Sequence, residues 1–222
     1  SHSHTSIDMS AINPRNKFPI PQLGLFQPDL YQFVVDKLVE VILAASNQMI
    51  PATIGTESVN LGEGWTRNRR KDNSFIDPIL TVTRVDRYSG EPFVVLVNWS
   101  THPTLMAAED MMFSGGWPGQ LQRNLEDLIA NEVMVMFYNG AEGDQSPVAC
   151  PESGSSNWER AERYGRALAI KAYDLWKTIS PQQISAIHSD LKKVSLPKRC
   201  WHPNATETGG KEYGMRDELM EV

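Results

Sequence analysis

The chain has 222 residues and a formal net charge of −6; 41% of its residues are hydrophobic and 22% are charged. This length and composition are typical of a folded globular chain, so a disulfide-stapled miniprotein and wholesale disorder are excluded. No stripe of lysine and arginine stands out, which argues against a nucleic-acid partner. Asp36, Lys37 and Glu40 interrupt the longest apolar stretch, residues 33–45, so we expect no transmembrane segment.

The first half of the chain predicts one helix followed by strands. Asp29 is placed to cap a helix that ends near Asn47, because apolar residues recur at helical spacing between them. A strand is expected over residues 51–59. The β-rich runs 79–85 and 92–99 flank a Tyr-Ser-Gly-Glu turn and predict a hairpin.

In the second half, a helix beginning at Pro118 should lead into a short buried strand, residues 133–138. A loop of roughly fifteen residues follows, and a third helix is expected over residues 157–177. Residues 183–195 predict a last strand. The tail over residues 198–222 is polar and contains little that could pack.

Strands that alternate with helices predict an α/β fold with a mixed β-sheet flanked by helices. We expect a single catalytic-type domain over residues 1–222, with a folded core over 1–197. The sequence begins at Ser1 without a methionine or a signal region, so we expect a leader to be cleaved or to lie outside it, and a fragment of a longer chain fits this pattern. Cys150 and Cys200 fit either one disulfide or two free thiols.

Two segments contain histidines that could carry chemistry. His2 and His4 are two positions apart, so in an extended segment both imidazoles point the same way and can bind one metal or divide the work of ligand and proton carrier. A tag or a disordered terminus would show the same pattern. His102 follows a buried β run and precedes Pro103, which places it at a strand end facing a cleft; a core or capping histidine is the alternative.

Two further segments contain polar groups suited to a site. In the loop 139–147, glycines allow close backbone approach to a ligand, Asp144 can orient its neighbours and Ser146 offers a hydroxyl. The run 66–71, which includes Arg69, supplies guanidinium groups for a carboxylate or an oxyanion. An ordinary turn and a solvated loop are the respective alternatives. The G-x-S-x-G, H-E-x-x-H, Walker and G-x-G-x-x-G motifs do not occur.

Taken in order, these segments resemble the catalytic domain of the neutral/alkaline non-lysosomal ceramidases. The matching motifs are His-Ser-His at 2–4, Asn-Arg at 68–69, Asn-Trp-Ser-Thr-His-Pro-Thr at 98–104, and Gly-Asp-Gln-Ser-Pro at 143–147. The resemblance covers about two thirds of the chain and depends mainly on the order of the motifs.

The resemblance implies zinc as cofactor, with His2 and His102 as the histidine ligands. It implies that His4 contacts the reacting centre, that Arg69 lies near the substrate oxygen, and that Ser146 is the active-site serine, as nucleophile or positioning group. The family also uses a later glutamate and tyrosine as zinc ligands, for which no segment after Ser146 matches. The stretch after His4 lacks the Ser-Gly-Pro that commonly follows in ceramidases.

The resulting hypothesis is a zinc-dependent amidohydrolase in which metal-activated water attacks the amide bond of a ceramide-like N-acyl lipid. One alternative is a metal-independent serine hydrolase in which His4 or His102, with Asp144, activates Ser146. Another is a non-catalytic module that binds a lipid or sugar. The resemblance implies a substrate at a membrane surface and a secreted or otherwise extracytoplasmic protein, with which a glycosylation sequon at residues 204–206 is compatible.

Overall fold

The computed structural model describes residues 2–17, 25–70, 73–110, 112–129, 132–148 and 155–195. Residues 1–185 form one compact unit and residues 186–222 a second. The described part of the second unit, residues 186–195, contains no helix or strand. Cys150, Cys200 and the expected tail from Lys198 lie outside the described residues.

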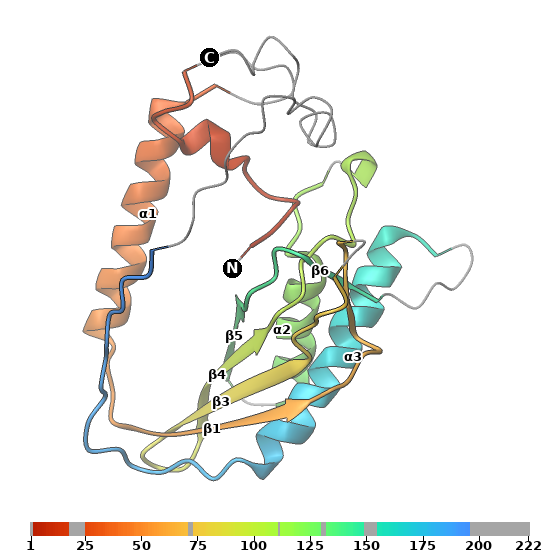
Figure 1. Ribbon diagram of the computed structural model, residues 1–222. Helices are drawn as coiled ribbons and strands as arrows, with labels where there is room; N and C mark the ends of the chain where they lie inside the picture. The colour runs from red at the N-terminus through yellow and green to blue at the C-terminus, as the bar shows by residue number, and fades with distance from the viewer. Residues whose placement is uncertain are drawn as a thin grey trace. The chain divides into compact units, whose positions relative to one another are not determined.

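A four-stranded sheet forms the centre of the first unit (Figure 1). Its spatial order is β1 (Ala52–Asn60), β3 (Ile79–Arg87), β4 (Pro92–Trp99) and β5 (Met134–Asn139). The β1–β3 and β3–β4 pairs are antiparallel, whereas β4 and β5 are parallel. The predicted hairpin and the mixed sheet of the α/β fold are therefore confirmed.

Two helices, α2 (Gly116–Ile129) and α3 (Asn157–Thr178), cover one face of this sheet (Figure 1). The third helix begins as its sequence predicts, because Ser156 and Glu159 form a capping box. Side chains that alternate along the strands meet apolar side chains of both helices in one core. The fully buried members of this core include Val82, Val97, Trp99, Trp117, Leu121 and Leu168.

A second, two-stranded antiparallel sheet joins β2 (Thr66–Asn68) to β6 (Gln145–Pro147). The sequence predicted only a loop after residue 139, because a three-residue strand has too little periodicity to be recognised. The small sheet brings residues 66–69 of the basic segment against the Gly-Asp-Gln-Ser-Pro segment, although 80 positions separate Thr66 from Ser146 in the sequence.

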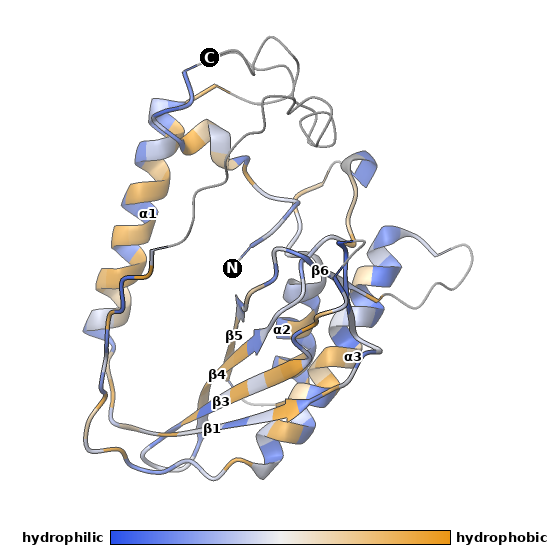
Figure 2. Cartoon of the chain, viewed as in Figure 1, coloured by the Kyte–Doolittle hydropathy of each residue, from blue (hydrophilic) through white to orange (hydrophobic). Residues whose placement is uncertain are grey.

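The predicted first helix is present as α1 (Pro28–Asn47), but none of its residues is buried. Hydrophobic residues, coloured orange, recur along it (Figure 2), and Val41 and Ile42 are each 65% exposed. It contacts the short 3-10 helix η1 (Met9–Ile12); a second 3-10 turn, η2 (Ala108–Asp110), precedes α2. Among the described helices, none combines the length and apolar character needed to cross a membrane.

The strand predicted over residues 183–195 is wrong. The described chain makes one isolated bridge, from Ile54 to Gln182, and then continues without regular structure to residue 195. The apolar residues of this segment are largely exposed, with Leu191 at 85%. A β-rich composition does not produce a strand here because no neighbouring strand in the described part of the chain pairs with it.

Candidate metal centre

The parallel strands β4 and β5 end at the same edge of the sheet, and the candidate site lies there. The segments that follow them stay together, because the backbone N–H of His102 donates to the carbonyl oxygen of Gln145 at 3.0 Å. Gly140 favours the close approach of these two segments, since a methyl group at its position would overlap Oγ of Ser100 and lie 3.1 Å from Cβ of the same residue. His102 therefore lies at the end of a buried strand, as its sequence context predicts.

Residues 2–5 lie along the same edge and bring two more histidines to it. The Thr5 hydroxyl donates to the carbonyl oxygen of Ser114 at 2.7 Å, and the Ser114 N–H donates back to the Thr5 carbonyl oxygen at 2.9 Å. At the other end of the segment, the His2 N–H donates to Asn139 Oδ1 at 2.7 Å. These contacts fix the segment at both ends.

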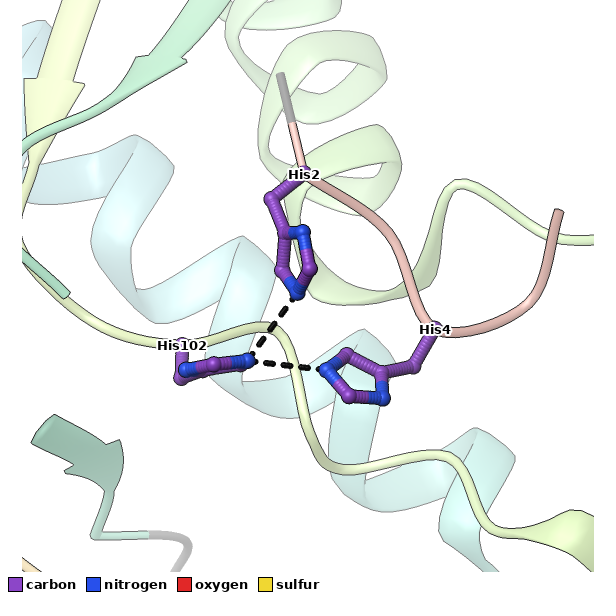
Figure 3. A group of neighbouring side chains, drawn as sticks. All are labelled: His2, His4 and His102. Atoms are coloured by element: carbon purple, nitrogen blue, oxygen red, sulfur yellow. Dashed lines mark hydrogen bonds between the residues drawn. The ribbon is translucent and has the colours of Figure 1, made fainter. Parts of the chain in front are cut away.

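Three imidazoles, those of His2, His4 and His102, converge at one point (Figure 3). The Nε2 atom of His102 lies 3.0 Å from Nε2 of His2 and 2.8 Å from Nε2 of His4. The three candidate ligand atoms all lie within 4.8 Å of one another. Two segments of the chain that are far apart in sequence thus form one cluster of nitrogen donors.

Burial favours the neutral form of two of these imidazoles. It is the largest cause that lowers the pKa of His4, and the charges of His2 and Arg69 lower it further. Burial is also the largest cause that lowers the pKa of His102, and the charge of Arg69 lowers it further. The hydrogen bond to the Glu142 carbonyl oxygen acts in the opposite direction. Burial raises the pKa of the Glu142 carboxyl, while the charge of His2 opposes this.

The hydrogen bond at Nδ1 of His102 fixes which nitrogen is free. Nδ1 lies 3.3 Å from the carbonyl oxygen of Glu142, and a carbonyl oxygen can only accept, so Nδ1 carries the hydrogen. In a neutral imidazole Nε2 is then unprotonated, and its lone pair points toward His2 and His4. This is the tautomer that ligation of a metal through Nε2 requires.

The donor set fits a zinc ion. Neutral imidazole nitrogen is a preferred zinc ligand, and two such ligands at ~2.0–2.1 Å from a tetrahedral ion stand about 3.3 Å apart. The two separations from His102 Nε2, 3.0 Å to His2 and 2.8 Å to His4, are close to that value, whereas the three nitrogens as a set are held only within 4.8 Å of one another. His2, His4 and His102 are the residues that could hold the ion, and His4 is as near to His102 as His2 is.

Arg69 lies beside this cluster, immediately after β2. Its Nε and Nη2 both donate to the Gly143 carbonyl oxygen, at 3.1 and 2.6 Å. Its backbone N–H donates to the Asp144 carbonyl oxygen at 2.7 Å, while the Asp144 carboxylate accepts from Asn68 Nδ2 at 2.8 Å. Asp144 therefore orients the Asn68–Arg69 segment, which is the role that the sequence suggested for it.

Ser146 lies on β6 opposite Arg67 and is half-buried. Its carbonyl oxygen accepts from the Thr66 hydroxyl at 3.3 Å. Within the part of the chain that the structure describes, its own hydroxyl has no hydrogen bond to His4 or His102. The structure thus joins His2, His4 and His102 through their Nε2 atoms and places the Arg69 charge close enough to act on His4 and His102, whereas Ser146 lies on β6 outside this cluster.

Three residues with structural roles at this edge were not recognised in the sequence. Asn139 bonds His2 and Glu142, Glu142 also bonds His102, and the fully buried Gln145 links the loop to the start of β3 through the Asp77 N–H at 2.9 Å. All three belong to the segment 139–147, which the sequence did single out. Their position in the same short loop as Ser146 was the feature of the sequence that could have drawn attention to them.

The comparisons with known proteins bear on the fold. No protein-family profile matches the sequence, and no curated protein sequence matches it. The neutral ceramidase from Pseudomonas aeruginosa has a similar structure, with a TM-score of 0.57 and 20% identity, over 69% of this chain and 26% of that chain. A ceramidase complexed with C2 has a TM-score of 0.59 and 20% identity, over 67% of this chain and 26% of that chain.

The resemblance to neutral ceramidases is therefore confirmed at the level of the fold. The chain spans about a quarter of the length of each of these two structures, 26% in both cases.

Proposed function

We propose that the chain carries the centre of a zinc-dependent amidohydrolase that cleaves the amide bond of a ceramide-like N-acyl lipid. The convergence of three imidazole nitrogens at the end of the β4–β5 pair is the observation that carries this proposal. The fold shared with two ceramidase structures supports the choice of substrate. The reaction consumes one water, breaks the C–N bond and releases a carboxylic acid and an amine.

Each residue of the cluster has a proposed part. His2 and His102 would hold the zinc, which when bound supplies a Lewis acid for the amide carbonyl and lowers the pKa of water. His4 faces the same point and would donate a hydrogen bond to the oxyanion that develops on the carbonyl oxygen. Arg69 would also donate to this oxyanion, because within the described part of the chain its side-chain hydrogen bonds, both to Gly143, use Nε and Nη2 and leave Nη1 for the substrate.

Ser146 is proposed to hold the substrate by a hydrogen bond. A serine nucleophile needs a neighbouring base, and the imidazoles of His4 and His102 face each other at 2.8 Å. Asp144, the acid that a serine triad would need here, also has another partner, because its carboxylate accepts a hydrogen bond from Asn68. These contacts favour the metal mechanism over the metal-independent serine mechanism.

The lipid substrate would be met at a membrane surface, and an extracytoplasmic location is part of the proposal. Fractionation of cells that produce the protein would test it, since retention of all the protein in the cytoplasm would contradict it.

The first experiment measures zinc per chain by elemental analysis, together with hydrolysis of a fluorescent N-acyl amide before and after chelation. We expect about one zinc per chain, with zinc and hydrolysis both lost in His102→Ala. His188→Ala is the matched control, because His188 is exposed and lies outside the cluster.

Three other outcomes would contradict the proposal. Hydrolysis that resists chelation but is lost in Ser146→Ala would indicate the serine mechanism. Binding of the amide without product would indicate a non-catalytic module. Unchanged zinc content and hydrolysis in His102→Ala would remove this cluster from the reaction.

A further inference from the structure

We propose that Asn139 and Glu142 are a positioning pair that orients both proposed metal ligands, His2 and His102. The inference rests on the proposed function and adds to it two residues that act through the histidines. Asn139 is the last residue of β5, and Glu142 lies three positions further along the loop. One short segment would therefore hold the main chain of His2 and the ring of His102, which come from two distant parts of the chain.

The first contact chain leads from the Glu142 carboxylate to His2. Asn139 Nδ2 donates to Glu142 Oε2, and Asn139 Oδ1 accepts from the backbone N–H of His2 at 2.7 Å. A carboxylate oxygen only accepts, so it holds the NH₂ group of Asn139 toward itself and turns Oδ1 toward His2. Without Glu142 the amide loses the partner that fixes its orientation.

The second contact leads from the Glu142 main chain to His102. Its carbonyl oxygen accepts from Nδ1 of His102 at 3.3 Å and from the Gln145 N–H at 2.9 Å. The Gln145 bond holds the carbonyl group in place as part of a turn. The carbonyl therefore sets the tautomer of His102 and directs its Nε2 toward His2.

The Asn139 contact should affect metal affinity most strongly through His2, because few hydrogen bonds hold the segment that carries this ligand. Residues 2–5 are held at Ser114 and at Asn139, so loss of the Asn139 contact would leave His2 free to move while Thr5 stays in place. Removal of residues that orient metal ligands typically weakens metal binding about 10- to 100-fold. We expect a loss in that range for Asn139→Ala and for Glu142→Ala.

The experiment determines the zinc dissociation constant of the full chain by competition with a chromophoric chelator. Asn60→Ala is the matched control, because Asn60 Oδ1 also accepts a backbone N–H, from Gly62 at 2.8 Å, and Asn60 does not belong to the histidine cluster. The decisive variant is the Asn139→Asp/Glu142→Gln double substitution, in which the amide and the carboxylate change places. It restores the bond with reversed polarity, so we expect it to recover most of the affinity that Asn139→Asp alone loses.

The outcomes separate the two proposals. If the unaltered chain binds no zinc, both the metal function and the positioning pair are overturned. If it binds zinc and Asn139→Ala and Glu142→Ala bind equally tightly, only the positioning pair is overturned. A double variant no better than Asn139→Asp would also overturn it.

A measurement without metal tests the Glu142 carbonyl contact in the unaltered chain, whether or not the variants fold. Correlation of imidazole nitrogens with ring protons by NMR distinguishes the two neutral tautomers. We expect the hydrogen of His102 on Nδ1. A hydrogen on Nε2 would overturn the proposed orientation of this ligand.

Discussion

Gly165 of α3 lies so close to Trp117 of α2 that a methyl group at Gly165 would stand 2.5 Å from the Trp117 carbonyl oxygen. The same methyl group would stand 2.6 Å from Cβ of Gln120. A backbone carbonyl in a helix cannot move alone, so the two helices would have to separate. The contact sets the spacing of the helical layer that covers the sheet.

We therefore predict that Gly165→Ala lowers the free energy of unfolding by about 1–3 kcal/mol, as overpacking does elsewhere. Urea unfolding followed by circular dichroism measures the change. The matched control is Gly119→Ala in α2, where the added methyl group meets only Arg123 Nη1 at 3.8 Å. Equal stability of Gly165→Ala and the unaltered chain would show that the helices are not packed this closely.

Tyr164 gives a prediction for alkaline pH. Burial raises its pKa from 10.0 to about 12. An unfolded chain releases this proton near the ordinary value and the folded chain does so later, so the free energy of unfolding should fall as pH rises from 10 to about 12. Unfolding curves across this range measure the fall.

Tyr164→Phe is the comparison variant for that measurement. The Tyr164 hydroxyl donates to the Trp65 carbonyl oxygen at 2.8 Å and accepts from Trp99 Nε1 at 3.1 Å. Loss of both bonds should cost about 1–3 kcal/mol at neutral pH, and the remaining pH dependence above 10 should be shallower. A pH profile as steep as that of the unaltered chain would contradict the assignment to Tyr164.

The three histidines should differ in what their removal does. We predict that His2→Ala and His102→Ala lose zinc, whereas His4→Ala retains about one zinc per chain and loses about 10²- to 10³-fold in kcat, as expected for a donor to the oxyanion. Elemental analysis and kinetics on the same preparations separate these effects. Equal loss of zinc in all three variants would instead make His4 a third ligand.

Arg69 should affect turnover and leave metal binding unchanged. Arg69→Ala is predicted to lower kcat about 10²- to 10³-fold at constant zinc content, because an oxyanion would lose its guanidinium partner. Arg166→Ala, which removes an exposed arginine from α3, controls for the change in net charge. Unchanged kcat in Arg69→Ala would exclude the arginine from the reacting centre.

Capping residues, turn residues and apolar periodicity in the sequence were enough to predict helices and strands that depend on neighbouring residues or that bury one apolar face. The capped helix α3, the β3–β4 hairpin and the position of His102 at a strand end were all predicted in this way. The helical spacing of α1 was also correct, although none of its residues is buried. Periodicity shows which residues share a face, but it does not show what covers that face.

Features that depend on distant partners were not predictable in the same way. The β2–β6 pair joins segments that have no individual strand signal, and residues 183–195 have a strand signal but no partner within the described chain. At the candidate site, His2, His102 and Arg69 could be named from ordered motifs. The contacts of Asn139 and Glu142 could not, because hydrogen bonds between side chains follow from a loop conformation that the sequence does not specify.

The distance in sequence between the histidines determines when the centre can form during folding. His2 and His4 lie 100 and 98 residues from His102, and closing a loop of that length costs about 4 kcal/mol of chain entropy plus a constant. A chain emerging from the ribosome presents His2 and His4 long before β5 exists to receive them. The contacts that hold His2 require Asn139, so the centre is completed only after the parallel β4–β5 pair has formed. Zinc binding by the nascent protein would thus mark the formation of this edge of the sheet.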